Sequence, residues 1–201
     1  MMKLRSSPAS PFGRKVKIAA YVLDLADRIE TVQADTNDAG DSLRIENPLG
    51  KIPCLILADG MAVYDSRVIV EHLDQLAGGG KILPAEPKAR IRSLTLQALA
   101  DGMMDAGLQM IYEQRWRSEA MRDAKWVAYQ QAKLDRALAV LEAAPPSGPI
   151  EIGQIALACA LGYLDLRFGG AWRAGHPGMV TWLDGFAAQV PSFEKTRFAQ
   201  P

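Results

Sequence analysis

The segment Ser10–Lys15 combines a hydroxyl group, a proline and two cations in a pattern that suits an anion. Ser10 and Pro11 predict the start of a helix, with serine as the N-cap and proline at the first helical position. Backbone amides and the helix dipole favour an anion at such a point, and no acidic residue precedes Asp24. The basic residues nearby are Lys3, Arg5, Arg14, Lys15 and Lys17. A thiolate would be stabilised there, but the segment holds no cysteine, so the sulfur would have to come from a ligand.

A second motif, N-P-L-G-K-I-P-C at 47–54, is a proline-rich turn that leads into a predicted strand. Pro53, close to the strand start, is a candidate for a cis peptide bond. A cis bond there would turn the backbone N–H and C=O groups of Ile52 outward. Those groups could then pair with an extended peptide as if it were an added strand.

The third motif is the pair Asp65-Ser66 at the start of another predicted helix. Asp65 can accept hydrogen bonds from an ammonium group. The Ser66 hydroxyl, together with the first amides of the helix, can hold a carboxylate. An ammonium and a carboxylate side by side are the pattern of a free amino-acid terminus.

Each motif also has a purely structural interpretation, as a helix cap or as a turn. The thiols of Cys54 and Cys159 are expected to be buried in the core, and no disulfide is expected. His72 and His176 lack the spacing of metal ligands, so no metal site is predicted.

A stripe of apolar residues runs along a long predicted helix, and core packing is its default role. Part of the stripe could also form the wall of a pocket for an apolar substrate. The residues proposed for that wall are Met104, Leu108 and Tyr112.

Two patterns of periodicity divide the chain. Up to about Ala77, short apolar runs alternate with helical stretches, and Asp59-Gly60 between two such runs predicts a hairpin. The order βαβα-ββα is typical of a thioredoxin-like α/β domain. The expected strands are 3–6, 29–34, 54–57 and 61–64, and the expected helices begin at Pro11, Asp41 and Ser66.

Glycines and prolines then mark a linker, and almost everything beyond it has helical periodicity. The predicted organisation is a thioredoxin-like domain at 1–77, a linker at 78–86 and an all-α domain at 87–201. The expected helices of the second domain are 87–117, 123–143, 152–168 and 177–190. The third of these is apolar nearly all round, as a helix at the centre of a bundle should be.

The composition excludes several classes of protein. The 201 residues carry 23 Lys+Arg and 23 Asp+Glu, which argues against a nucleic-acid binder that depends on phosphate contacts. The longest uncharged run, Ile152–Leu164, is 13 residues long, shorter than a membrane span requires. The polar, basic N-terminus is unlike a signal peptide, and two distant cysteines suit a reducing compartment. A cytoplasmic protein is expected.

In this order and at these spacings, the motifs resemble the glutathione S-transferase family, and in particular its bacterial cytosolic branches related to the beta and omega classes. The likeness spans essentially the whole chain. It is carried by S-P-x-S-P-F-x-R-K-V, N-P-L-G-K-I-P, D-S and I-G-Q-I-A-L-A-C-A-L-G-Y-L-D-L-R. The resemblance implies a glutathione site in the first domain and an acceptor-substrate site between the domains.

The resemblance also implies roles for single residues. Ser10 matches the residue that hydrogen-bonds the glutathione sulfur, and Ile52 with a cis Pro53 matches the pair whose backbone meets the cysteinyl unit. Asp65 and Ser66 match the pair that holds the γ-glutamyl end. Lys51 matches a contact to the glycyl carboxylate, and Phe12 belongs to the same implied glutathione-binding set.

The chain departs from the family pattern at a few positions. Asp65 is one methylene shorter than the more usual glutamate. Glu151 stands where the central helix usually has a serine or threonine N-cap, while Gln154 keeps the third helical position of a capping box. The changed cap is expected to cost about 1 kcal/mol. A serine in place of a cysteine at position 10 disfavours chemistry through a mixed disulfide.

The leading hypothesis is therefore a glutathione transferase that activates the glutathione thiol for conjugation to small electrophiles, and so serves detoxification. Glutathione-dependent isomerisation or dehalogenation is a variant of it. The alternative from another class is a non-catalytic, transferase-like module for protein interaction or regulation. Such modules tend to lose ligand-holding residues, whereas Ser10, Pro53, Asp65 and Ser66 are all present. The resemblance further implies a symmetric homodimer. From the residues themselves, no metal, nucleic-acid or membrane partner is expected.

Overall fold

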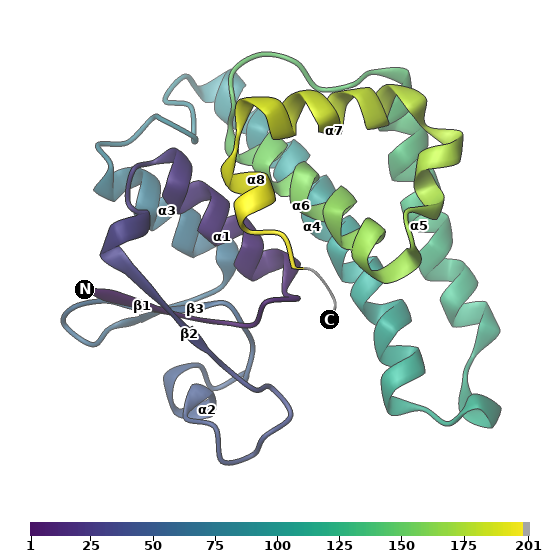
Figure 1. Ribbon diagram of the computed structural model, residues 1–201, viewed down its shortest axis with the longest axis horizontal. Coiled ribbons are helices and arrows are strands. Elements are labelled where there is room, and N and C mark those ends of the chain that lie inside the picture. The colour runs from purple at the N-terminus through teal and green to yellow at the C-terminus, as the bar shows by residue number, and fades with distance from the viewer. Residues whose placement is uncertain (199–201) are drawn as a thin grey trace.

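The computed structural model describes residues 1–198 (Figure 1). The N-terminal part contains a four-stranded mixed sheet in the order β2-β1-β3-β4. Strand β1 (Met2–Ser6) runs parallel to β2 (Ile29–Gln33) and antiparallel to β3 (Cys54–Ile56). The predicted hairpin joins β3 to β4 (Ala62–Val63), with Leu55 opposite Val63. The thioredoxin-like arrangement predicted from the alternation of short strands and helices is confirmed.

Two helices cover one side of this sheet. Figure 1 shows α1 (Pro11–Val22) and α3 (Ser66–Leu76) together there, and the short α2 (Leu43–Glu46) on the other side. Side chains alternate along a strand, so Leu4 of β1 faces inward and is completely buried. It packs in one core with Ile69 and Leu73, which recur at the helical spacing of four residues on α3.

The C-terminal part is all helical, as predicted. Its helices are α4 (Pro87–Trp116), α5 (Ala124–Ala143), α6 (Ile152–Phe168), α7 (Pro177–Gln189) and the one-turn α8 (Ser192–Lys195). Short 3-10 segments, η1 (Ala26–Arg28), η2 (Glu119–Met121) and η3 (Ala171–Gly175), lie between the larger elements. Every residue from Ile152 to Leu161 is buried, so α6 is the central helix that its apolar sequence predicts.

The start of α6 differs from the capping box expected for it. Glu151 is the N-cap but makes no side-chain capping bond, and the Gln154 amide donates to the Ser147 carbonyl instead. The first amides of α6 find partners elsewhere, because the Ile152 N–H donates to the Ile82 carbonyl at 2.9 Å. Neighbouring backbone thus replaces the missing cap and satisfies an amide that would otherwise be buried without a partner.

The connection between the two parts runs from the end of α3 to the start of α4. Gly78, Gly79 and Gly80 all have positive φ angles, 106°, 76° and 73°, which suit glycine. Asp74 is completely buried and accepts hydrogen bonds from three amides of this connection, those of Gly80, Lys81 and Ile82. A single hydrophobic core continues from the sheet into the helical part. No helix within residues 1–198 is long and apolar enough to cross a membrane.

Candidate active site

Ser10 is the N-cap of α1, and its geometry leaves its proton available. The Ser10 Oγ atom accepts from the Gly13 N–H at 3.1 Å, and the residue is 9% exposed. A serine hydroxyl has one donor and two acceptor positions. Within residues 1–198 the Ser10 hydroxyl donates to no partner, so it can cap the helix and donate to a ligand at once. The two interpretations of this serine are therefore compatible.

Gly13 allows the start of α1 to lie close against β1. A Cβ atom built on Gly13 would come within 2.0 Å of the Ser6 Oγ atom. A larger residue would push the Ser6 hydroxyl aside and crowd the Ser6 Cβ atom, 3.2 Å from the added atom, so space rather than backbone conformation favours glycine here. The close contact holds the start of α1, and with it the N-cap Ser10, against the end of β1. The positive end of the helix dipole lies at this same point.

The positive charge around Ser10 is smaller than the sequence suggests. Arg5 pairs with Asp41 at 2.5 Å and with Glu46 at 3.3 Å. Lys15 is completely buried and its Nζ atom lies 2.6 Å from Asp101 Oδ1. Two of the five basic residues are thus paired with carboxylates that come from other parts of the chain. Arg14 has no such carboxylate among the described residues.

The turn before β3 has the backbone form that the second motif predicts. The Ile52–Pro53 peptide bond is cis. Asn47 holds the turn, because its amide donates to the Lys51 carbonyl at 2.8 Å and its side-chain oxygen accepts from the Leu49 N–H at 3.1 Å. The side chain of Ile52 is half-buried and Lys51 is exposed, so both can be reached by a ligand.

Asp65 and Ser66 begin α3 as predicted. Asp65 is the N-cap and accepts from the Arg67 N–H at 2.9 Å, while Ser66 is 3% exposed. The Arg67 side chain joins Asp65 to Asp101 of α4, at 3.3 Å and 3.7 Å respectively. Alternating charges thus run from Lys15 through Asp101 and Arg67 to Asp65. Burial raises the pKa of the Asp101 carboxyl, and the attraction of Lys15 opposes that shift.

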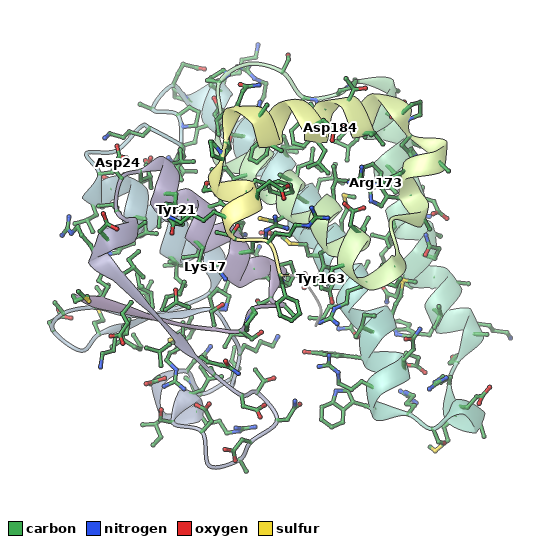
Figure 2. All side chains as sticks on the ribbon, viewed as in Figure 1. Lys17, Tyr21, Asp24, Tyr163, Arg173 and Asp184 are labelled. Carbon is green, nitrogen blue, oxygen red and sulfur yellow. The ribbon has the colours of Figure 1, made fainter. Side chains whose placement is uncertain are left out.

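A cavity of about 610 Å³ opens beside Ser10. Its wall combines the loop before α1 with α1 itself, α6, η3, α7 and the segment around α8. Residues that matter for its chemistry are Ser10, Arg14, Cys159, Tyr163, Arg173 and Asp184. Figure 2 shows Tyr163, Arg173 and Asp184 on the helical side of the molecule, and Lys17 on α1. The volume lies within the range of small-molecule sites.

The apolar stripe on α4 does not line this cavity. Met104 is completely buried in the core, because α4 packs along α6 and buries this face of the helix. The prediction that Met104 lines a substrate pocket is therefore wrong. Leu108 and Tyr112 are half-buried, as is Phe12 on α1. Their predicted contacts with ligands stay predictions.

The cavity wall includes charged side chains as well as apolar ones, whereas the sequence predicts a pocket for an apolar substrate. Arg173 pairs with Asp165 through hydrogen bonds of 2.8 and 2.6 Å, and the Trp172 indole N–H donates to the same carboxylate. Burial raises the pKa of the Cys159 thiol to about 11, so this sulfur stays protonated at neutral pH. The Cys54 thiol is also free, with its pKa raised to about 11 by burial. No group of three metal-ligating side chains gathers anywhere in residues 1–198.

The fold and the site together define a two-domain protein in which a thioredoxin-like domain presents a serine at a helix start to a cavity shared with a helical domain. Family models for the N-terminal and C-terminal domains of glutathione S-transferases match residues 4–81 and 105–185. The chain belongs to the glutathione S-transferase family.

Matches over the full length of the chain agree with this assignment. The chain is 33% identical over 201 residues to the uncharacterized GST-like protein YibF of Escherichia coli, covering 97% of this chain and 98% of the relative. A glutathione transferase family member from Pseudomonas fluorescens, solved with bound glutathione, is 40% identical with a TM-score of 0.93 and full coverage of both chains. A second structure from that organism holds S-(propanoic acid)-glutathione. It is 38% identical, with a TM-score of 0.88 over 99% of this chain and 100% of the other.

Proposed function

We propose that the chain is a serine-site glutathione transferase that binds glutathione on its N-terminal domain and activates the thiol for attack on a small electrophile. The observation that carries the proposal is Ser10, which caps α1 through its oxygen and keeps its proton for a ligand beside the 610 Å³ cavity. A hydroxyl that donates to sulfur favours the thiolate over the thiol. Conjugation of this kind detoxifies reactive electrophiles.

The proposed site holds glutathione at several points. The backbone of Ile52 pairs with the cysteinyl unit, and Asp65 and Ser66 bind the ammonium and carboxylate of the γ-glutamyl end. Lys51 contacts the glycyl carboxylate, and Phe12 flanks the ligand. These contacts bring the sulfur to Ser10, so a reaction between two solutes becomes one within a single complex. The thiol proton has by then left to solvent. The thiolate forms the new S–C bond while the electrophile's leaving group departs with its bonding electrons, or while the electrophile's π bond opens and the freed electron pair takes a proton from water.

The relatives support a site for glutathione and its conjugates. Glutathione is bound in one Pseudomonas fluorescens structure, and the other holds a conjugate whose added group is a propanoic acid. A conjugate places its added group next to the sulfur, on the acceptor side. We infer that this chain binds its acceptor substrate in the cavity beside Ser10, and that its class is a serine-site branch related to the beta and omega enzymes.

Glutathione-dependent isomerisation and dehalogenation would use the same thiolate and remain variants of the proposal. The non-catalytic alternative has less support, since the ligand-holding residues are all present and Ser10 keeps a usable proton. A screen with aryl halides, isothiocyanates, hydroperoxides and epoxides separates these activities. Turnover of none of them by a protein that binds glutathione would favour the non-catalytic module.

Removing the side chains that hold the γ-glutamyl end should weaken glutathione binding. Loss of a charge-assisted hydrogen bond costs about 1.5–3 kcal/mol, so Ser66→Ala and Asp65→Ala are each expected to lower affinity about tenfold to hundredfold. Calorimetry with glutathione measures this directly. Asp123→Ala is the matched control, because Asp123 caps α5 as Asp65 caps α3 but lies outside the proposed site. Unchanged affinity in both site variants would mean that glutathione binds elsewhere.

A symmetric homodimer in the cytoplasm completes the proposal. The two free, buried thiols agree with a reducing compartment. Val68 of α3 and Ile91 of α4 are 51% and 64% exposed, and the Glu71–Arg90 ion pair of 2.6 Å joins the same two helices nearby. Such apolar side chains suit a contact with a second copy.

Sedimentation should therefore show a species of twice 21.9 kDa at micromolar concentration. The double variant Val68→Asp with Ile91→Asp should shift it toward 21.9 kDa, because charges would be buried in the contact. Val140→Asp, at a valine of α5 that is 65% exposed, is the control and should leave the species unchanged. A stable 21.9 kDa species in the unaltered protein argues against the dimer.

A further inference from the structure

Arg14 is a buried cation without a carboxylate partner. The residue is 8% exposed, and none of the ion pairs among residues 1–198 includes it. Its neighbour Lys15 is equally buried but is paired with Asp101. Arg173, in the wall of the same cavity, is paired with Asp165. A buried charge is costly unless a counter-charge or strong hydrogen bonds compensate it, so Arg14 stands out among the cations near the site.

The guanidinium of Arg14 is held in place while part of it stays available. Its Nη2 atom donates to the Phe193 carbonyl at 2.5 Å, and its Nε atom donates to Thr196 Oγ1 at 3.3 Å. The guanidinium also lies over the Phe193 ring, 4.1 Å from its centroid. The third nitrogen, Nη1, has no hydrogen-bond partner among the described residues. It lies beside Gly162, where a Cβ atom would come within 2.5 Å of it.

Arg14 is well placed relative to Ser10. The two residues lie one turn apart on the same side of the start of α1, and the Arg14 N–H donates to the Ser10 carbonyl at 2.9 Å. Four residues of α-helix span about 6 Å along the axis. Both residues line the cavity of about 610 Å³. A sulfur atom at Ser10 would thus lie at the edge of a cavity whose wall also includes Arg14.

We propose that Arg14 binds a carboxylate on the acceptor substrate, so that the enzyme selects small electrophiles that carry a negative charge. This inference rests on the proposed function, because it places the carboxylate relative to the glutathione sulfur. The N–H groups of a guanidinium are spaced to donate to the two oxygens of a carboxylate. The ligand would also supply the counter-charge that the described residues do not. The other arginines of the cavity already have partners, Arg173 with Asp165 and Arg197 with Glu194.

An α,β-unsaturated carboxylate is an electrophile of this class. The thiolate forms an S–C bond to the β-carbon, the π electrons of the C=C bond move to the α-carbon, and that carbon takes a proton from water. The product carries its carboxylate two carbons from the sulfur. No oxidant or reductant is needed. Arg14 touches only the carboxylate and so acts as a binding residue that sets specificity.

The test compares two conjugates of nearly identical shape, S-(2-carboxyethyl)glutathione and its neutral amide, S-(2-carbamoylethyl)glutathione, by calorimetry. The unaltered protein should bind the acid about tenfold more tightly than the amide, because only the acid pairs with the buried charge. Arg14→Gln should abolish this preference, and Arg14→Lys should keep part of it. Arg197→Gln is the control, since the Arg197 side chain also lines the cavity but is 64% exposed, and it should leave the preference intact.

Two results would overturn the assignment. The first is equal affinity of the unaltered protein for the acid and the amide, a result that needs no variant. An equal loss of affinity for both conjugates in Arg14→Gln would leave Arg14 only as a contact between α1 and the α8 segment. Failure of the unaltered protein to bind glutathione or either conjugate would instead contradict the proposed function, and this inference would fall with it.

Discussion

Replacing Asp101 with alanine should lower the free energy of unfolding by about 3–5 kcal/mol, because it leaves the charge of Lys15 buried without a partner. The side chain of Lys15 is 0% exposed and that of Asp101 is 6% exposed, with 2.6 Å between Nζ and Oδ1. Urea denaturation measures the change. The double variant Lys15→Met with Asp101→Leu should recover most of the loss, since apolar residues of similar size can replace a buried pair.

A matched control is available on the surface. Arg197 and Glu194 form an ion pair of 3.2 Å, and their side chains are 64% and 54% exposed. Solvent screens such a pair, so Glu194→Ala should cost less than about 1 kcal/mol. Equal losses in Asp101→Ala and Glu194→Ala would show that the buried pair between α1 and α4 has no special role in stability.

Replacing Ser10 with alanine should lower kcat/KM about tenfold to hundredfold near neutral pH. The lost hydrogen bond favours the thiolate, so its removal should raise the thiol pKa of bound glutathione by about one to two units, at about 1.36 kcal/mol each. The loss should shrink as pH rises, because glutathione is then ionised in both proteins. Affinity for glutathione should change little. Rate measurements over a pH series test the loss in kcat/KM and its pH dependence, and calorimetry tests the affinity for glutathione.

The same substitution also removes a helix cap, which should lower the melting temperature. Asp123→Ala removes the cap of α5 and serves as control, with a lower melting temperature but the unaltered pH–rate profile. Ser10→Cys should shift activity toward disulfide exchange, since a thiol at this helix start would itself ionise. A Ser10→Ala protein with unaltered rates at every pH would leave Ser10 as a helix cap alone.

Local signals allowed the sequence to predict most of the fold. The Asp59-Gly60 turn, the cap of α1 at Ser10 and the cap of α3 at Asp65 each depend on neighbours within a few residues. The cis bond before Pro53 is likewise a local feature. The buried run of α6 could be predicted because a helix apolar all round has only one stable place, the centre of a bundle.

Features that depend on distant residues could not be predicted in the same way. Lys15 is paired with a residue 86 positions away, and Arg14 contacts one 179 positions away. The sequence shows both only as members of a basic run. The stripe on α4 reveals an apolar face but not what covers it, so the sequence predicts a pocket wall at Met104, which lies in the core. The charged side chains in the cavity wall, such as Arg173 paired with Asp165, likewise come together only in the packed helices.

Binding of glutathione at Ser10 and ionisation of its thiol are the core of the proposed function. Ultraviolet titration of the thiolate absorbance of bound glutathione tests it most directly. A free thiol of this kind titrates near about 8.5. We expect the bound thiol to titrate at least about one unit lower in the unaltered protein and to return toward the solution value in Ser10→Ala. A thiol that titrates at its solution value in the unaltered protein, or at the same lowered value in both, would contradict it.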